Sequence, residues 1–551
     1  MTAVRRVAVV GAGAAGCFFT HELVRRIPQV RVDLYDREGR GPGAGIVLAW
    51  EFAERLRAAH PRALDLPAAD TARWDRTRTL VGDQVIWSGA YGTSGFRRRA
   101  FHAHLRALTA GLPQVELRLL EVERTPQDAD LVVLADGAGS RLREARREAF
   151  RPRTAEGATR YQWLSTPAVL EPSFVLRDTA AGPLVVHAYP HAADESTFIV
   201  EADPRVLDAA GMLNLPADET ARLLADVFAD ELRGAPLTAH LPAWRPFRTL
   251  VTERWYDGSS VLVGDAAHTV HFSTGSGTSL AVGDALELAR AVAEEDTVAA
   301  ALKRYAATRQ PLVARAQAEA GDSMLWFERA CRRGRRNGHQ TVFALRSRRD
   351  HNTFARLRER DPEFVARTVA QLAPPLPDGE PVDLPLVLGA LALSGRLVRL
   401  TTDDRGRPAE LRLPSAAAAL RCPVVATAAE AAGSACALLR AGVVDGEAGG
   451  AAGSASLRLE REVAALRSGG ALAVGLLFDG ETRNASPSEA DFLAVPLQEG
   501  AGRVTRTRLA DDLRHAHRLP VLLLSDAPLD RDEANTLIAA GRIDLAVGSV
   551  G

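Results

Sequence analysis

A glycine-rich turn near the N-terminus constrains the fold more than any other feature of the chain. The β-branched run Val7–Val10 leads into Gly11-x-Gly13-x-x-Gly16, and a helical stretch follows. Glycines at this spacing allow a tight turn and let the backbone approach a pyrophosphate, which then lies at the positive end of the helix. The next strand ends in Asp36, where a carboxylate can accept hydrogen bonds from a ribose. The pattern predicts a strand–helix–strand opening that binds a dinucleotide, without choosing between FAD and NAD.

A second motif follows another buried strand. Leu131–Leu134 is an apolar run, and a DGxxSxxR pattern follows it with Asp136, Ser140 and Arg143. The spacing places the serine and the arginine on one face of the following turn. By itself the pattern is more typical of an ordinary strand exit with a capping aspartate and a solvated arginine.

The third motif is Gly264-Asp265-Ala266-Ala267-His268, directly after the strand predicted at 261–263. Gly264 lets the chain turn beneath the ribityl group of a flavin, and Asp265 can accept a hydrogen bond from a ribityl hydroxyl. Gly275 and Gly277 then precede a predicted helix. The N–H groups and positive end of that helix favour the negative charge of a reduced flavin ring.

The bulk composition excludes several classes of partner. A chain of 551 residues with 46% hydrophobic and 25% charged residues is typical of a globular protein with three or four domains. With a net charge of −1, the chain has no overall electrostatic attraction to nucleic acid or to an anionic membrane. The four cysteines have no metal-binding spacing, and no apolar stretch reaches the roughly 18 residues of a membrane span. We therefore expect no metal, nucleic acid or membrane partner, and a cytoplasmic location.

Changes of pattern divide the chain into an α/β protein of three parts. Residues 156–249 contain strands joined by polar turns, as in an antiparallel sheet. The three motifs lie on either side, which predicts one domain from 1–155 and 250–373, the latter with a helical extension. Pro374-Pro375-Leu376-Pro377 marks a boundary, and 380–551 forms a further domain.

The three motifs, in this order, resemble the class A flavoprotein monooxygenases. The resemblance implies a Rossmann-like FAD-binding domain with an inserted antiparallel-sheet substrate domain. From residue 1 to about 370 it narrows to the anthraniloyl-CoA monooxygenase/reductase and salicylyl-CoA 5-hydroxylase subgroup. The stretches that carry it are Trp163 onward, His187-Ala188-Tyr189-Pro190, Ser196–Glu201, Glu253-Arg254-Trp255-Tyr256, His268–Thr278, Trp326-Phe327-Glu328 and Arg346-Ser347-Arg348-Arg349.

The resemblance also implies a cofactor site and a chemistry. The run Arg97-Arg98-Arg99 occupies the place of an FAD-contacting arginine, which we assign to Arg98. The residues expected to bind FAD are Gly11, Gly13, Gly16, Asp36, Arg98, Asp136, Gly264, Asp265, Gly275 and Gly277. NAD(P)H reduces FAD in this family, O2 then forms a C4a-hydroperoxyflavin, and an electron-rich aromatic ring attacks its terminal oxygen. The protein positions the ring and excludes water, so no dedicated nucleophile is required.

Three side chains are candidates for proton transfer. His187 and Tyr189 alternate on one strand face, and His271 lies beside the third motif. A histidine of near-neutral pKa could relay the proton lost during hydroxylation, but the strong alternative is that His187 and Tyr189 are satisfied packing residues. The basic run Cys331-Arg332-Arg333-Gly334-Arg335-Arg336 could bind CoA phosphates or an acidic carrier protein, or could be a solvated helix end.

The last region resembles a shortened Old Yellow Enzyme barrel. Pro381–Leu400 and Asp532–Gly548 are similar to its opening and closing pieces, but roughly 170 residues are available where a barrel typically has about 250. Leu400-Thr401-Thr402 replaces that family's Ser-Pro-Met after the first strand, and Gly548-Ser549 replaces its phosphate-binding Gly-Arg. No histidine occurs between His351 and His515, so the family's mid-barrel histidine pair cannot be present. We predict a truncated α/β-barrel-like domain without FMN, serving packing, formation of a homodimer or docking of a partner.

The sequence thus predicts a hydroxylase of an amino- or hydroxy-substituted aryl thioester, carried on CoA or an acyl carrier protein. In the anthraniloyl-CoA monooxygenase/reductase the Old Yellow Enzyme domain binds FMN and reduces the ring, and its loss here favours a biosynthetic role over catabolism. Two alternatives stay open: hydroxylation of a free aromatic or indole intermediate, and a flavin-binding scaffold without turnover. A flavin halogenase is disfavoured because the chain has no WxWxI motif.

Overall fold

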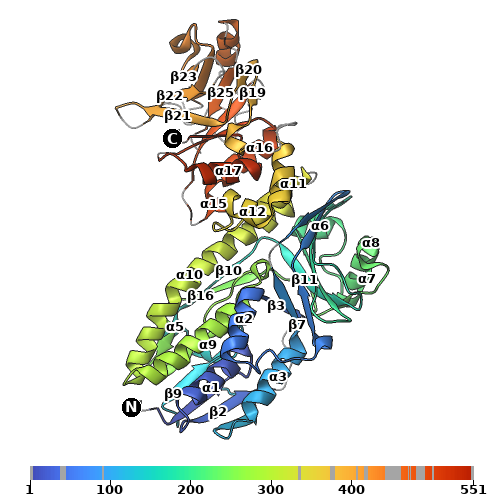
Figure 1. Cartoon of the computed structure of the whole chain (residues 1–551), viewed down its shortest axis with the longest axis vertical. Helices are drawn as coiled ribbons and strands as arrows, with labels where there is room; N and C mark the ends of the chain where they lie inside the picture. The colour runs from blue at the N-terminus through green and yellow to red at the C-terminus, as the bar shows by residue number, and fades with distance from the viewer. Residues whose placement is uncertain are drawn as a thin grey trace. The chain divides into compact units, whose positions relative to one another are not determined.

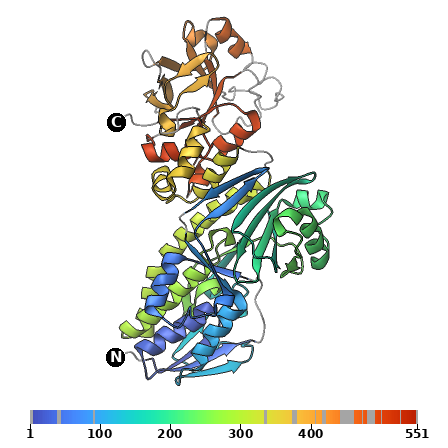
Figure 2. The same cartoon turned by 45° about the vertical axis from the view of Figure 1, so that its right-hand side comes forward.

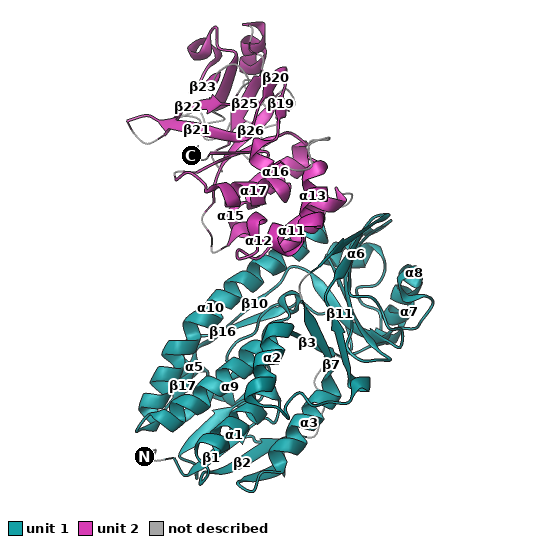
Figure 3. Ribbon diagram, viewed as in Figure 1, with its two compact units in different colours: residues 1–335 teal, residues 336–551 magenta. Residues whose placement is uncertain are grey.

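The chain forms two compact units, residues 1–335 and 336–551, in the computed structural model (Figures 1, 2 and 3). The structure describes residues 4–37, 45–89, 92–332, 337–372, 379–404, 407–414, 420–440, 461–469, 471, 473–478, 490–498, 500, 502–525 and 527–547. The proline-rich boundary predicted at 374–377 lies outside the described residues, as does Gly548-Ser549.

A six-stranded sheet forms the centre of the first unit, in the order β17-β18-β9-β1-β2-β8. From β18 to β8 neighbouring strands run parallel, and β9 is buried along its whole length. Continuous apolar strands of this kind are typical of a sheet covered on both faces. The strands are β1 Arg6–Val10, β2 Arg31–Asp36, β8 Val115–Leu119, β9 Leu131–Leu134, β17 Tyr256–Asp257 and β18 Ser260–Leu262.

Two helices that are far apart in sequence, α1 and α9, pack side by side in this unit. Both belong to the same apolar core as the parallel sheet. The helices that concern the site are α1 Ala14–Arg26, α2 Trp50–Ala59, α3 Arg98–Ala110, α4 Arg141–Ala145, α9 Gly277–Glu294 and α10 Val298–Ala330. Of the helices in the described part of the chain, none combines the length and apolarity needed to cross a membrane.

A second, seven-stranded sheet has the order β15-β11-β14-β13-β12-β5-β6, and we call it the substrate sheet. Its neighbours pair antiparallel, as predicted for this region, except for the parallel pair β5 and β12. β5 and β6 come from outside the predicted range 156–249. The strands are β5 Thr77–Val81, β6 Gln84–Ser88, β11 Arg160–Thr166, β12 Ser173–Thr179, β13 Gly182–Pro190, β14 Ser196–Ala202 and β15 Thr238–Ala239.

The two faces of the substrate sheet have different neighbours. Val186, Ala188, Phe198 and Val200 point to one face and join an apolar core with residues of the helices α6 Pro204–Ala209, α7 Ala217–Val227 and α8 Ala229–Leu232. Because side chains alternate along a strand, the residues between them face the other side. Smaller sheets complete the unit: β3 Gly45–Ala49, β4 Thr71–Trp74 and β7 Thr93–Arg97 form one, and β10 Pro152–Glu156 with β16 Arg248–Thr252 forms another.

The second unit contains a closed barrel of eight strands, β21 to β28. β22 runs antiparallel to both of its neighbours, and the other pairs are parallel. An antiparallel strand needs only short hairpins, whereas a parallel one needs a long crossover, so the barrel closes within a short chain. The strands are β21 Leu397–Thr402, β22 Pro408–Leu413, β23 Leu420–Val425, β24 Cys436–Arg440, β25 Ala473–Leu477, β26 Phe492–Pro496, β27 Val521–Leu524 and β28 Leu545–Val547.

Apolar side chains fill the inside of this barrel. Alternate residues of its strands fall into two cores: Leu493 and Leu523 pack with residues of α17, while Phe492 and Leu522 belong to a core whose described members all come from strands. The second core includes leucines of the hairpin β19 Leu386–Leu388 and β20 Leu391–Leu393. The described interior is therefore apolar.

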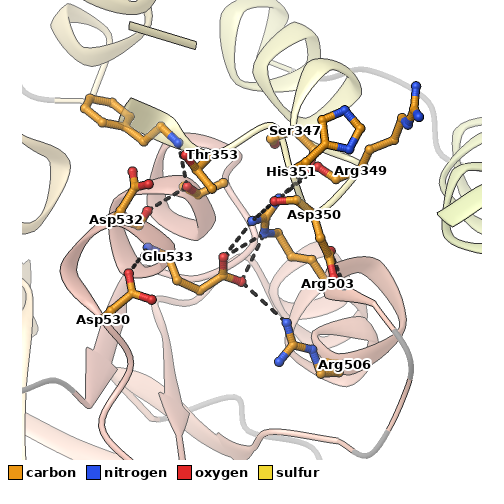
Figure 4. Close-up of polar contacts among 12 residues, drawn as sticks. Ser347, Arg349, Asp350, His351, Thr353, Arg503, Arg506, Asp530, Asp532 and Glu533 are labelled. Carbon is orange, nitrogen blue, oxygen red and sulfur yellow. Dashed lines mark hydrogen bonds and ion pairs between the residues drawn. The ribbon is translucent and has the colours of Figure 1, made fainter. Parts of the chain in front are cut away.

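A buried arginine joins three helical segments of the second unit (Figure 4). Arg503 is 1% exposed and forms an ion pair with Glu533 at 2.6 Å. It also donates to the Ser347 carbonyl at 2.7 Å, and its backbone N–H donates to the Asp350 carboxylate at 2.8 Å. These contacts group helices α11 Gly338–Arg346, α12 Phe354–Arg360 and α13 Pro362–Ala370 with α15 Arg503–Arg506, α16 Arg508–His517 and α17 Arg531–Ala539.

Candidate active site

The N-terminal glycines have distinct roles in the turn between β1 and α1. Gly11 has a φ of +107°, and a Cβ there would lie 2.3 Å from the Ala135 carbonyl oxygen. A Cβ on Gly16 would lie 1.9 Å from the Gly11 carbonyl oxygen, so both positions require glycine for packing. Gly13 has nothing within 4 Å of its Cβ position. The turn leaves open space at the start of α1, where a pyrophosphate would lie.

The end of β2 places Asp36 beside this turn. Its carboxylate accepts from the Ala12 N–H at 3.4 Å and lies 3.2 Å from the Arg106 guanidinium. The side chain is half-buried, so part of its accepting capacity faces the open space. This arrangement fits the predicted contact with a ribose.

The second motif is tied to the third by its arginine. Ser140 caps α4 by accepting from the Arg143 N–H at 3.0 Å. The Arg143 side chain is 4% exposed and donates to the Ala266 carbonyl at 3.0 Å, so it is not a solvated arginine. Asp136 keeps a buried carboxylate oxygen without a hydrogen-bond partner, and burial raises the pKa of this group. An unpaired buried acceptor is costly, which fits a hydroxyl donor from a ligand.

The third motif is held by a residue that the sequence analysis did not identify. Asp284 of α9 is fully buried and accepts from the Gly264 N–H at 3.2 Å, from His268 at 2.6 Å and from Arg309 at 2.7 Å. Gly264 has a φ of +61°, and a Cβ there would lie 2.9 Å from the Ala281 Cβ. The tight turn therefore seats the motif against α9. An acidic residue on the apolar face of a predicted helix was the signal for this role.

The loop after the third motif leads to the start of α9. Gly275 has a φ of +61°, and a Cβ there would lie 2.9 Å from Val47 Cγ2. At Gly277 only Val270 Cγ2 comes within 4 Å of the Cβ position, at 3.9 Å. The Asp265 side chain is exposed, but many protein atoms lie around it. Their exclusion of water raises the pKa of Asp265, although the charges of His268 and Arg98 act in the opposite direction. The carboxylate lines open space and does not pack into a core.

Adjacent arginines at the start of α3 differ in their partners. Arg97 forms ion pairs with Asp70 at 2.7 Å and with Asp194 and Glu195. Arg98 has no carboxylate within ion-pair distance among the described residues, and its buried Nε has no partner. Burial lowers the pKa of Arg98 although Tyr189 and Asp265 oppose that shift. Arg97 therefore has a structural role, and Arg98 is the arginine available to a ligand.

The three candidate proton-transfer residues lie in two places. His187 is buried and its Nε2 bonds Glu201 at 2.6 Å, and His271 Nε2 lies 3.8 Å from the same carboxylate. Tyr189 is half-buried, stacks on Trp74 with ring centroids 5.9 Å apart, and has its pKa raised by burial. The structure thus brings the two histidines together on Glu201, a residue not identified from the sequence, and separates them from Tyr189.

Half-buried aromatic rings line the same face of the substrate sheet. Tyr161 and Trp163 pack against Phe272 with ring centroids 5.0 and 5.8 Å apart. The Trp163 indole N–H is buried without a partner, and the Arg98 guanidinium lies 5.8 Å from the indole ring. Aromatic walls with a few unpaired donors are typical of a site for a flat organic ring.

These residues fit a bound FAD. Gly13 and Gly277 leave open backbone at two helix starts, Asp136 supplies an unpaired acceptor, and Arg98 supplies an unpaired donor. Within the described residues no group of three His, Cys, Asp or Glu side chains could hold a metal ion. Arg332 of the predicted basic run pairs with Asp203 at 2.8 Å, and 333–336 lie outside the described residues.

Comparison with known proteins agrees with this geometry. Residues 92–320 match the family model described as "FAD binding domain". A 3-hydroxy-4-methyl-anthranilyl-[aryl-carrier protein] 5-monooxygenase from Streptosporangium sibiricum is 35% identical over 327 residues, covering 59% of the chain and 89% of that relative. The chain belongs to the FAD-dependent monooxygenases. It is an enzyme of the class A aromatic hydroxylase group, which confirms the resemblance derived from the three motifs.

Two further relatives of this monooxygenase differ in how much of it they match. Salicyloyl-CoA 5-hydroxylase from a Streptomyces species is 29% identical over 562 residues, covering 99% of the chain and the whole of that relative. Protodeoxyviolaceinate monooxygenase from Chromobacterium violaceum is 33% identical over 334 residues, covering 59% of the chain and 89% of that relative. Only the first of these two likenesses therefore extends through the barrel unit.

Proposed function

We propose that this monooxygenase hydroxylates an amino- or hydroxy-substituted aryl thioester, carried on CoA or on an acyl carrier protein. The observation that carries the proposal is the pair of relatives named for such substrates, one matched over the full chain and the other at 35% identity. NAD(P)H serves as reductant and O2 as the oxygen source, and FAD supplies the oxygen-activating chemistry when bound.

The residues of the first unit support this assignment at both ends of the flavin. The adenosine end is proposed to bind at Gly11, Gly13, Gly16 and Asp36 and the ribityl chain at Asp265, with Asp136, Gly264 and Arg98 nearby. The ring is proposed to lie against Gly275 and Gly277. The parallel sheet that carries these residues is Rossmann-like in this proposal.

The substrate ring is proposed to lie between the flavin and the aromatic face of the substrate sheet. The unpaired Trp163 N–H suits a substrate oxygen, and Tyr189 lies on the side of Arg98. An electron-donating substituent on the ring supplies the nucleophilic push, and the aromatic wall excludes water. Tyr189, His187 and His271 stay proposals as proton-handling residues.

The barrel is proposed to be an Old Yellow Enzyme-like domain that does not bind FMN. Its described interior is apolar, and no histidine occurs between residues 351 and 515. Packing, a homodimer contact or partner docking remain its proposed roles. A cytoplasmic location and a biosynthetic role also stay predictions.

Product analysis by mass spectrometry tests the substrate class. Purified enzyme with FAD, NADH or NADPH and O2 is offered matched aryl-CoA thioesters, aryl-carrier thioesters and the corresponding free acids. We expect a mass gain of one oxygen atom on a thioester and none on its free acid. Oxygenation of free aromatics alone would reject the proposal. That outcome would favour the second candidate, which the relative named for protodeoxyviolaceinate supports.

A further inference from the structure

A buried carboxylate lies on the face of the substrate sheet that carries Tyr161 and Trp163. Glu201 on β14 is 1% exposed. One of its oxygens bonds His187 Nε2 at 2.6 Å, and the other accepts from the Thr159 hydroxyl at 3.5 Å and lies 3.8 Å from His271 Nε2. A buried carboxylate is tolerated only when it is paired and hydrogen-bonded. The two imidazoles are therefore what allow a glutamate at this position.

The two histidines come from different parts of the fold. His187 lies on β13, next to Glu201 in the same sheet. His271 begins the loop of residues 271–277, which we call the flavin-facing loop, and its side chain caps the turn at 272–274. Glu201 thus joins the substrate sheet to the loop that carries Gly275 and Gly277.

The depth of this cluster argues against direct contact with a substrate. His187 is 5% exposed and His271 is 2% exposed. The Phe272 ring lies 5.4 Å from the first imidazole and 4.2 Å from the second, and Phe327 lies 4.4 Å from His187. The cluster packs against Phe272 of the aromatic face, so its contact with the site passes through that ring and the loop.

We propose that Glu201 is a positioning residue that fastens the flavin-facing loop to the substrate sheet through His271, while the bond to His187 holds the carboxylate in place. The inference rests on the proposed placement of the flavin ring against Gly275 and Gly277. Burial alone would raise the pKa of Glu201, but the hydrogen bond from His187 and the charge of His271 outweigh burial and lower it. The charged carboxylate therefore holds both imidazoles, and a neutral side chain of the same shape would hold them less firmly.

The test replaces the charge and measures FAD directly. Apo-protein carrying Glu201→Gln is titrated with FAD by flavin fluorescence, and the visible circular dichroism of the bound flavin reports the surroundings of its ring. The control is Glu231→Gln, which removes a carboxylate paired with Arg177 elsewhere in the substrate domain. We expect Glu201→Gln to raise the FAD Kd about tenfold, because the loop loses its contact between His271 and a charged carboxylate, and to change the dichroism. Glu231→Gln should leave both measurements unchanged.

A second variant covers the case in which Glu201→Gln does not fold. His271→Asn keeps a capping side chain for the turn at 272–274 but no longer reaches Glu201, and it leaves the His187–Glu201 bond intact. It should reproduce the higher Kd and the altered dichroism. Wild-type Kd and dichroism in the variants that fold would overturn the proposal, even if product formation fell. Because the readout is FAD binding, failure of the thioester panel would not affect it.

Discussion

Gly13 and Gly16 belong to one motif, yet a methyl group added at each would meet different surroundings. At Gly16 it would lie 1.9 Å from a backbone oxygen, which cannot move aside. At Gly13 it would enter open space beside the start of α1. The same residue type therefore serves packing at one position and ligand access at the other.

This difference predicts opposite effects of two alanine substitutions. Gly16→Ala should destabilise the apo-protein by about 1–3 kcal/mol or more, because overpacking against backbone is not relieved. Gly13→Ala should leave thermal unfolding of the apo-protein nearly unchanged but raise the FAD Kd at least about tenfold, because the methyl group would occupy the proposed pyrophosphate position. Thermal unfolding and FAD titration measure the two effects. Normal FAD binding by Gly13→Ala would place the pyrophosphate elsewhere.

A histidine on α3 predicts a pH dependence of stability. Burial, with the nearby charges of Arg98 and Arg106, lowers the pKa of His102 from 6.5 to about 4. As the pH falls, His102 therefore takes up a proton in the unfolded chain before it does so in the folded protein. The neutral side chain contributes fully to the free energy of unfolding above pH 6.5, and this contribution is lost between pH 6.5 and 4. The loss is at most about 3 kcal/mol. In apo-protein, His102→Gln should lose less thermal stability than wild type between pH 7.5 and pH 5; equal losses would contradict the assignment.

At the scale of elements, α9 supports the site at two points. Its first residue, Gly277, offers open backbone, and Asp284 two turns later holds the third motif through Gly264 and His268. Because one rigid helix carries both features, the ribityl end and the ring end of the proposed flavin position move together. The helix therefore fixes the distance between the third motif and Gly277.

Removing the charge of Asp284 should disturb this support. Asp284→Asn can still accept from the Gly264 N–H, but it leaves His268 and Arg309 without their buried carboxylate. We expect a loss of about 3 kcal/mol and weaker FAD binding. Glu294→Gln on the same helix removes an exposed carboxylate and should change neither property. Thermal unfolding and FAD titration check both variants, and an Asp284→Asn protein with wild-type FAD affinity would show that the third motif is held without it.

For the whole molecule, the division into units predicts separable effects. Arg503→Met removes the ion pair with Glu533 and the bonds to the carbonyl groups before α12, and it should destabilise the second unit by about 3–5 kcal/mol. Hydrogen exchange should rise across 336–551, while FAD affinity stays at the wild-type value because the proposed FAD residues lie in the first unit. Arg508→Met, which alters an exposed side chain on α16, is the control. Unchanged exchange in 336–551 would contradict the role given to Arg503.

The sequence by itself determined the family and the local turns of this protein. Gly11 and Gly264 predict tight turns at the ends of strands, because only a residue without a side chain fits those turns. The family resemblance selected Arg98 from a run of three arginines as the FAD contact, and that assignment stays a prediction. Such signals are readable because they depend on neighbours along the chain.

Only the tertiary structure decided which distant groups meet. Glu201 pairs with His187 and His271, Asp284 holds His268, and β5 joins the substrate sheet beside β12. The eight barrel strands also form a closed ring in which only β22 is antiparallel, an arrangement that the chain length did not reveal. Pairings of this kind depend on burial and packing between segments far apart in sequence. A local pattern of residue types therefore does not predict them.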